Sequence, residues 1–259
     1  MSVCYLFIIL FYKQKNYFVK NNYKIYYLMD ASKKKGKIIV IEGIDGSGKQ
    51  TQSKLLTEYL KQKNKSVQLQ SFPNYESQSA GPVKMYLGGE LSHSADEINA
   101  QQSSVLFAVD RFCTMKVLSR KITNDTIMIF DRYVSSNMLH QGGKIKDRQE
   151  LVKFLQWLDD FEFNTMGLPK PDIVFFLDMP PNKSMELAHK RSELKAGTKE
   201  DIHEKDSSHL LHAYDTGKFI ANMFGWHIVN CVNEKGELRV ASEISQDIIN
   251  EVNKLFDNN

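Results

Sequence analysis

Five short runs with β-branched or aromatic residues alternate along the chain with longer amphipathic or polar stretches. The runs Ile127–Phe130 and Ile173–Leu177 are apolar throughout, which is typical of strands buried on both faces of a parallel sheet. Strands that alternate with helices predict such a sheet, covered by the helices. We therefore expect an α/β fold, a three-layer sandwich with five parallel strands at Lys37–Glu42, Val67–Ser71, Ile127–Phe130, Ile173–Leu177 and His227–Asn230.

The stretches between these strands have the periodicity of helices. We expect helices at Gly48–Lys63, Pro82–Gly89, Ala95–Lys121, Asp147–Asn164, Pro181–Arg191, Asp201–Phe224 and Glu237–Phe256. No repeat or linker divides residues 29–259, which we interpret as a single domain. Ligands of such sheets bind beyond the carboxyl ends of the strands, so the residues that follow each strand are the first candidates for a site.

Residues 1–28 differ in composition from the rest of the chain. They contain four lysines and no acidic residue, and without them the formal net charge changes from +3 to −1. The apolar run Val3–Tyr12 is too short to span a bilayer, and lysines follow it where a signal peptide has small residues. We expect this extension to lie outside the fold, with Met29 as the true start. A membrane or targeting anchor is the alternative.

The remaining composition excludes several classes of protein. Cys4, Cys113 and Cys231 are far apart and form no C-x-x-C pair, which argues against a disulfide framework or a zinc site. This pattern suits a reducing compartment, so we expect a cytoplasmic protein. The domain has no basic patch that would indicate nucleic-acid binding, and we expect neither a nucleic acid nor a membrane as partner.

The stretch 38–51 carries the strongest chemical signal. A strand leads into Gly43, and Gly48 and Lys49 follow at the G-x-x-x-x-G-K spacing before a helix. Glycines let the loop curl so that its N–H groups surround phosphate oxygens, and the lysine and helix N-terminus add positive charge. The pattern predicts a nucleoside triphosphate site. Gln50 stands where Ser or Thr normally binds magnesium, and Thr51 comes one residue later.

Further candidates follow the second and third strands. Phe72 lies in a Ser-Phe-Pro-Asn-Tyr turn, where aromatic rings could line a planar pocket. Arg132 follows the third strand, where a guanidinium can grip a phosphate with its forked donors. Phe107 and Arg111 are four residues apart on one helix, an arrangement that suits a nucleobase. Each of these features taken alone is also compatible with packing or a surface turn.

A charged stretch, residues 190–206, follows the fifth expected helix. Such a run is usually a solvated loop. In an enzyme with a phosphate loop it can also be a lid that brings cations over the phosphates.

Together these segments resemble the thymidylate kinase family, enzymes that use ATP to phosphorylate dTMP. The matching motifs occur in the family's order: Gly-Ile-Asp-Gly-Ser-Gly-Lys, Phe-Pro-Asn-Tyr, Leu-Phe-Ala-Val-Asp-Arg, Asp-Arg-Tyr-Val-Ser-Ser-Asn and Asp-Ile-His-Glu. They cover the chain from about residue 37 onward. The resemblance implies the fold of the P-loop nucleoside monophosphate kinases, ATP and dTMP as substrates, Mg²⁺ as cofactor and a homodimer.

The resemblance also implies residue roles. The ATP phosphates and their surroundings would be contacted by Gly43, Ile44, Asp45, Gly46, Ser47, Gly48, Lys49, Gln50 and Thr51. The dTMP site would contain Phe72, Phe107, Arg111, Arg132, Asn137, His140 and Glu204. In it Phe107 would stack on thymine, Arg111 and Asn137 would bind the base, and Arg132 would hold the phosphate. Lys49, Arg132 and Asp45 would act in catalysis, and Asp45 would also face the metal.

Two features depart from the family's usual pattern. The phosphate loop lacks the arginine that some members carry, so we expect the lid to supply the cation, with Arg191 first and Lys195 or Lys199 next. His140 stands where many members have a tyrosine that crowds the sugar's 2′ position. An imidazole can fill the same space, so the resemblance leaves the strictness against ribonucleotides open.

Other functions remain open at this point. Another nucleotide or deoxynucleoside kinase is the nearest alternative, although the latter would carry a carboxylate where this chain has Phe72. A small GTPase would carry Asn-Lys-x-Asp, and the Asn-Lys sequence at 182–183 lacks the Asp. A catalytically inactive nucleotide-binding module is the third alternative, supported by Gln50.

Overall fold

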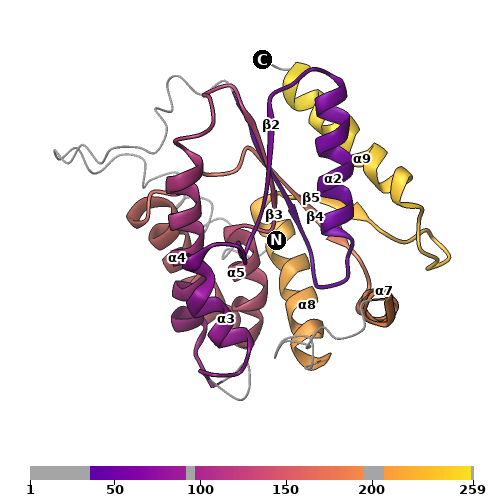
Figure 1. Ribbon diagram of the computed structural model, residues 1–259. Helices are drawn as coiled ribbons and strands as arrows, with labels where there is room; N and C mark the ends of the chain where they lie inside the picture. Colours follow the sequence, from indigo (N-terminus) through magenta and orange to yellow (C-terminus); the bar gives the residue numbers. More distant parts are fainter. Residues whose placement is uncertain (1–35, 92–96, 195–206, 258–259) are drawn as a thin grey trace, which may run out of the picture.

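The sheet agrees closely with the sequence pattern. The computed structural model describes residues 36–91, 97–194 and 207–257 (Figure 1). Its strands are β1 Ile38–Glu42, β2 Val67–Ser71, β3 Ile127–Asp131, β4 Ile173–Asp178 and β5 His227–Asn230. Neighbouring strands all pair in parallel, in the order β2-β3-β1-β4-β5. The expected five-stranded parallel sheet is confirmed.

Helices cover both faces of this sheet, and the period of two along each strand determines which side chains meet which layer. Ile38 and Val40 of β1 join one core cluster, whereas Ile39 and Ile41 join the other. The first cluster packs under α4 Ala100–Leu118, α5 Val134–His140, α6 Arg148–Asp159 and α8 Ser207–Phe224. The second packs under α2 Lys49–Gln62 and α9 Ala241–Asp257, which lie together on the opposite side of the sheet (Figure 1).

Four further helical elements complete the connections in the described part of the chain. They are η3 Gln78–Ala80, α3 Gly81–Leu87, η4 Gly142–Lys144 and α7 Pro181–Leu194. None of the helices in the described part of the chain is long and apolar enough to cross a membrane.

Helix α4 begins later than the periodicity predicts. The expected start was Ala95, but the helix begins at Ala100 because Asn99 caps it: Asn99 Oδ1 accepts from the Gln102 amide at 2.9 Å. The Gln102 side chain accepts in return from the Asn99 amide at 3.3 Å, so the pair forms a capping box. The helix therefore starts where its unpaired amides first find side-chain acceptors.

The sequence pattern did not predict two local features of the fold. Helix α5 was not expected, because its Ser-Ser-Asn sequence is not apolar enough to indicate a helix. The single helix expected at Asp147–Asn164 is instead α6 followed by a π-helical segment, η5 Asp160–Thr165. The wider turn rotates Glu162 into the interior, where its side chain is fully buried.

The register of the sheet places the ends of three strands side by side. Ser71 of β2 pairs with Asp131 of β3, which in turn pairs with Ile41 of β1. The loops that follow β1, β2 and β3 consequently leave the sheet at one edge. This is the edge at which we expected the site.

Candidate active site

The loop between β1 and α2 has the backbone that phosphate binding requires. Gly43, Gly46 and Gly48 all have positive φ, at 151°, 76° and 91°, where most side chains are strained. A Cβ at Gly46 would also lie 2.4 Å from the Ser184 carbonyl oxygen of α7, so the loop packs directly on that helix. Ser184 Oγ donates to the Asp45 carbonyl oxygen. Both contacts come from Ser184, so α7 supports the loop.

Lys49 is the first residue of α2 and lies inside the loop. Only 5% of its side chain is exposed, and Nζ donates to the carbonyl oxygens of Gly43 at 2.8 Å and Ile44 at 2.7 Å. Burial, together with the charge of Arg132, lowers the pKa of this ammonium to about 8, although Asp45 and Glu42 oppose the shift. The ammonium is fixed at the loop, where the resemblance places the terminal phosphates.

Arg132 joins the end of β3 to the phosphate loop. Its φ is +68°, which is uncommon for a residue other than glycine, and its guanidinium forms an ion pair with Asp45. Burial alone would raise the pKa of Asp45, but the charges of Arg132 and Lys49 outweigh it and hold that pKa well below its usual range. Arg132 Nη1 also lies 3.1 Å from His140 Nε2, which must accept because a guanidinium only donates.

Glu42 is a buried carboxylate that we did not expect in the site from the sequence. It is 0% exposed at the end of β1 and accepts from Ser135 Oγ at 2.7 Å, from Ser136 Oγ at 2.9 Å and from the Gly43 amide at 3.0 Å. Its charge lies close enough to raise the pKa of Arg132, against the opposing effect of burial. Glu42 therefore ties the start of α5 to the start of the phosphate loop.

The residues expected to read a nucleobase meet around one carboxylate. Arg111 is 2% exposed and makes two hydrogen bonds to Glu162, from Nε and from Nη2, both 2.6 Å. Asn137 Nδ2 donates to the same carboxylate at 2.9 Å and to the Ser104 carbonyl oxygen at 3.1 Å. Glu162 was missed because Asp159, Asp160 and Glu162 form an acidic run that is typical of a solvated surface. A buried arginine demands an acidic partner, but the sequence offers many.

The two candidate phenylalanines differ in their surroundings. Phe107 is half-buried and packs edge-to-face on Tyr86 of α3, with ring centroids 6.0 Å apart. Phe72 is 3% exposed and packs against the rings of Phe130 and Tyr133 at 5.6 and 5.9 Å. The surroundings of Phe72 favour a packing role, and its contact with the sugar stays a prediction.

Several oxygen atoms around the loop could serve as magnesium ligands. Within the described residues no three side chains of the types His, Cys, Asp and Glu form a metal cage. Mg²⁺ keeps several waters and is usually bound by one or two carboxylates together with substrate phosphates, so such a cage is not needed. The Asp45 carboxylate fits that arrangement, and the buried Ser47 Oγ has no hydrogen-bond partner in the described part of the chain. Gln50 and Thr51 are both exposed.

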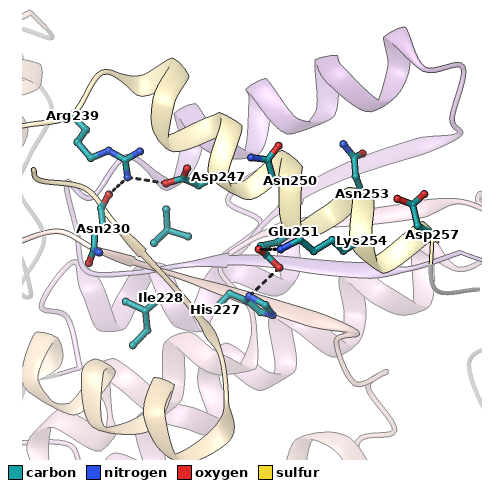
Figure 2. Close-up of a pocket in the computed structure, with 11 residues that line it drawn as sticks. His227, Ile228, Asn230, Arg239, Asp247, Asn250, Glu251, Asn253, Lys254 and Asp257 are labelled. Carbon is teal, nitrogen blue, oxygen red and sulfur yellow. Dashed lines mark hydrogen bonds and ion pairs between the residues drawn. The ribbon is translucent and has the colours of Figure 1, made fainter.

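A separate pocket lies between β5 and α9 (Figure 2). Its cavity volume is about 620 Å³, and its lining contains none of the residues that we expected in a site. The charged side chains around it pair with one another: Arg239 with Asp247 at 2.8 Å and Lys254 with Glu251 at 2.6 Å. It offers no chemistry that bears on nucleotide binding.

Comparison with known proteins agrees with this site. The profile of the family described as thymidylate kinase matches residues 41–225, which include the phosphate loop, Arg111, Arg132 and Glu162. This chain belongs to the thymidylate kinase family. A thymidylate kinase of Plasmodium falciparum is 34% identical over 227 residues, which cover 88% of this chain and 94% of that protein.

More distant thymidylate kinases align over a smaller part of the chain or share only the fold. One from Mycobacterium tuberculosis is 30% identical over 171 residues, covering 66% of this chain and 78% of its own length. The structure of a thymidylate kinase from Candida albicans superposes with a TM-score of 0.61 and 21% identity, covering 85% of this chain and 93% of that one. The expected nucleoside monophosphate kinase fold is thereby confirmed.

Most of the lid expected for this thymidylate kinase family member lies outside the described residues. Glu204, Lys195 and Lys199 lie outside the described residues, as does the extension 1–28. Arg191 belongs to α7, but its side chain is not among those described. The expected lid therefore stays a prediction.

Proposed function

We propose that this chain transfers the γ-phosphoryl group of ATP to dTMP, giving ADP and dTDP for dTTP synthesis. The observation that carries the proposal is the ion pair between Arg132 and Asp45. It joins the phosphate loop to the end of β3. Helix α5 follows β3 and carries Asn137, which shares the Glu162 carboxylate with Arg111. The Arg132–Asp45 ion pair would thus connect a triphosphate site at the loop with a base site near Arg111. The relatives of this chain are named thymidylate kinase.

The chemistry of this reaction suits the side chains present. The acceptor is a phosphate oxygen of dTMP that is already ionised near neutral pH, so no general base is needed. The difficulty is to bring two polyanions together in line. Lys49 and Arg132 would neutralise that charge at fixed positions, and preorganised charge of this kind is usually the largest catalytic contribution. Bound Mg²⁺ would add Lewis-acid stabilisation of the phosphate oxygens, and we assign Asp45 as the residue facing it.

The base and sugar would be recognised on the other side of Arg132. Phe107 would stack on thymine, Arg111 and Asn137 would bind its polar edge, and Phe72 and His140 would lie near the deoxyribose. A missing methyl group changes binding only modestly, so we expect dUMP to be a poorer substrate rather than an excluded one.

The lid would supply a further cation to the transferring phosphoryl group. We assign Arg191 to this role, with Lys195 or Lys199 as substitutes, and Glu204 to the orientation of acceptor or metal. An Arg191→Ala protein should lose about tenfold or more in turnover with little change in thermal stability. Near-normal turnover would remove this assignment.

We further propose that the protein is a homodimer that packs through helices. Val105 and Val109 lie one turn apart on α4, and both are more than one third exposed. An apolar stripe on a helix that otherwise covers the core suits a helix-to-helix interface. Light scattering on the purified protein tests this, and a Val109→Asp variant should shift the dimer toward monomer.

The decisive experiment is a coupled ADP-release assay on protein that begins at Met29. We expect ADP release with dTMP, weaker release with dUMP, and little with AMP, GMP or thymidine. Release with thymidine but not dTMP would favour a deoxynucleoside kinase. A protein that binds ATP but turns over none of these acceptors would be an inactive nucleotide-binding module.

A further inference from the structure

Glu162 is the shared partner in the cluster formed by Arg111, Asn137 and Glu162, and its side chain is 0% exposed. It nevertheless contacts both side chains expected to read the base. Arg111 Nη2 and Asn137 Nδ2 share a single oxygen, Oε1, at 2.6 and 2.9 Å, and Arg111 Nε holds the other oxygen at 2.6 Å. The arginine and the amide are therefore neighbours that are fixed by one carboxylate.

This carboxylate determines which way the Asn137 amide points. Both N–H groups of Nδ2 are used, one on Glu162 Oε1 and one on the Ser104 carbonyl oxygen at 3.1 Å. Rotating the amide by 180° would place Oδ1 against two acceptors, a carboxylate and a carbonyl, and remove the hydrogen bond that each accepts from Asn137. The network therefore selects one orientation.

Two polar atoms of these side chains remain, the acceptor Asn137 Oδ1 and the donor Arg111 Nη1. Among the described residues nothing else donates to Asn137 Oδ1, and nothing accepts from Arg111 Nη1. The cluster thus leaves one acceptor, Asn137 Oδ1, and one donor, Arg111 Nη1, for a ligand. Thymine and uracil carry an N3–H donor beside a carbonyl oxygen, which matches this pair. Cytosine carries an N3 acceptor beside an amino group, which opposes it at both positions.

We propose that Glu162 is a positioning residue that sets the hydrogen-bonding polarity of the base site, so that pyrimidines with a 4-oxo group are accepted and those with a 4-amino group are rejected. The inference rests on the proposed function, because it assumes that Arg111 and Asn137 face the base. Glu162 acts through these two side chains and makes no contact with the nucleotide. The alternative is that it serves only as a buried counter-ion for Arg111.

The two possibilities differ in the ratio of kcat/KM for dTMP to kcat/KM for dCMP. Glu162→Gln keeps the size of the side chain but places an N–H₂ group against donors, so the Asn137 amide is free to rotate. We expect KM for dTMP to rise roughly tenfold or more and the dTMP-to-dCMP ratio to fall by at least roughly tenfold, while KM for ATP changes less than about twofold. A counter-ion role would lower thermal stability without changing that ratio.

Asp172→Asn provides the control. Asp172 is a carboxylate outside the base site whose Oδ2 accepts from the Ile38 amide at 2.7 Å at the start of β1. Its variant should lower the melting temperature and leave the dTMP-to-dCMP ratio unchanged. If Glu162→Gln behaves in the same way, the positioning role is wrong.

A second variant covers the case in which Glu162→Gln does not fold. Glu162→Asp keeps the charge, but its shorter side chain cannot hold Arg111 and Asn137 at once, so the same fall in the ratio is expected, and an unchanged ratio would overturn the inference. Wild-type protein that fails to phosphorylate dTMP would contradict the proposed function itself. Wild-type activity with an unchanged ratio in both variants would contradict only the inference about Glu162.

Discussion

The proposed site has two ends, a phosphate end at the loop that follows β1 and a base end around Arg111, and they are built in different ways. At the phosphate end, Gly43 to Lys49 form one continuous segment whose backbone amides and lysine come from adjacent positions. At the base end, Arg111 comes from α4, Asn137 from α5 and Glu162 from η5, and these three elements meet only in the folded chain. The first kind of site is visible as a motif, whereas the second depends on tertiary packing.

Because the two ends are built differently, we expect substitutions at them to have different effects. The phosphate end is held by glycine conformations and by contact with α7, so its shape is local. The base end is held by a buried ion pair, and removing one partner leaves an uncompensated charge. We therefore expect substitutions at the phosphate end to change catalysis most, and substitutions at the base end to change affinity, selectivity and stability together.

The largest expected effect is that of Lys49→Ala. Removing a preorganised cation from the phosphates should lower kcat by roughly 10³-fold, because its contribution is greatest in the transition state. Steady-state kinetics with saturating dTMP measure this, with circular dichroism to verify folding. A fall of less than about tenfold would show that the lysine is not the main cation of the phosphate end.

Arg132→Ala should have the next largest effect and should distinguish the two substrates. A charge-assisted contact with a phosphate contributes about 2 to 3 kcal/mol, so KM for dTMP should rise roughly 10²-fold. KM for ATP should change much less, because Lys49 and the loop amides remain. Equal losses for both substrates would mean that Arg132 belongs to the phosphate end alone.

The sequence predicted the phosphate end better than the base end, for physical reasons. The five strands were predicted to within about one residue. Strands β1, β3 and β4 are buried apolar runs, which have few alternative conformations, whereas β2 and β5 are more exposed and less apolar. The Gly-rich loop was evident because glycine is required at its positive φ angles. Glu162 could not be predicted, since its burial depends on a π-helical turn that no residue pattern indicated. Helix α5 was missed because its Ser-Ser-Asn sequence interrupts the apolar periodicity that indicates a helix.

Phe107→Ala examines the base end through stacking. Base–aromatic stacking is worth about 1 to 3 kcal/mol per base, so the dissociation constant for dTMP should rise roughly tenfold or more. Isothermal titration calorimetry gives this constant directly. Val117→Ala, on the same helix at a side chain that is 55% exposed, provides a control that should leave dTMP binding unchanged. A Phe107→Ala protein with unaltered affinity would refute the stacking assignment.

The smallest expected effect concerns pH and involves the phosphate end alone. The pKa of Lys49 is lowered to about 8, so the cation needed for phosphate binding is lost as pH rises through 8. The value of kcat/KM for ATP should fall roughly fourfold between neutral pH and pH 8.5, as a single ionisation of the free enzyme. Because the unfolded chain holds this proton up to its ordinary pKa of 10.5, the same group makes the free energy of unfolding increase with pH between about 8 and 10.5.

Two variants locate that ionisation. Lys49→Arg retains a cation throughout this range, so the decline in kcat/KM should move to higher pH. Phe107→Ala should weaken dTMP binding yet keep the decline near pH 8, because it changes only the base end. A decline that stays near pH 8 in Lys49→Arg would assign the ionisation to another group. The pH dependence of kcat/KM would then no longer distinguish the phosphate end from the base end.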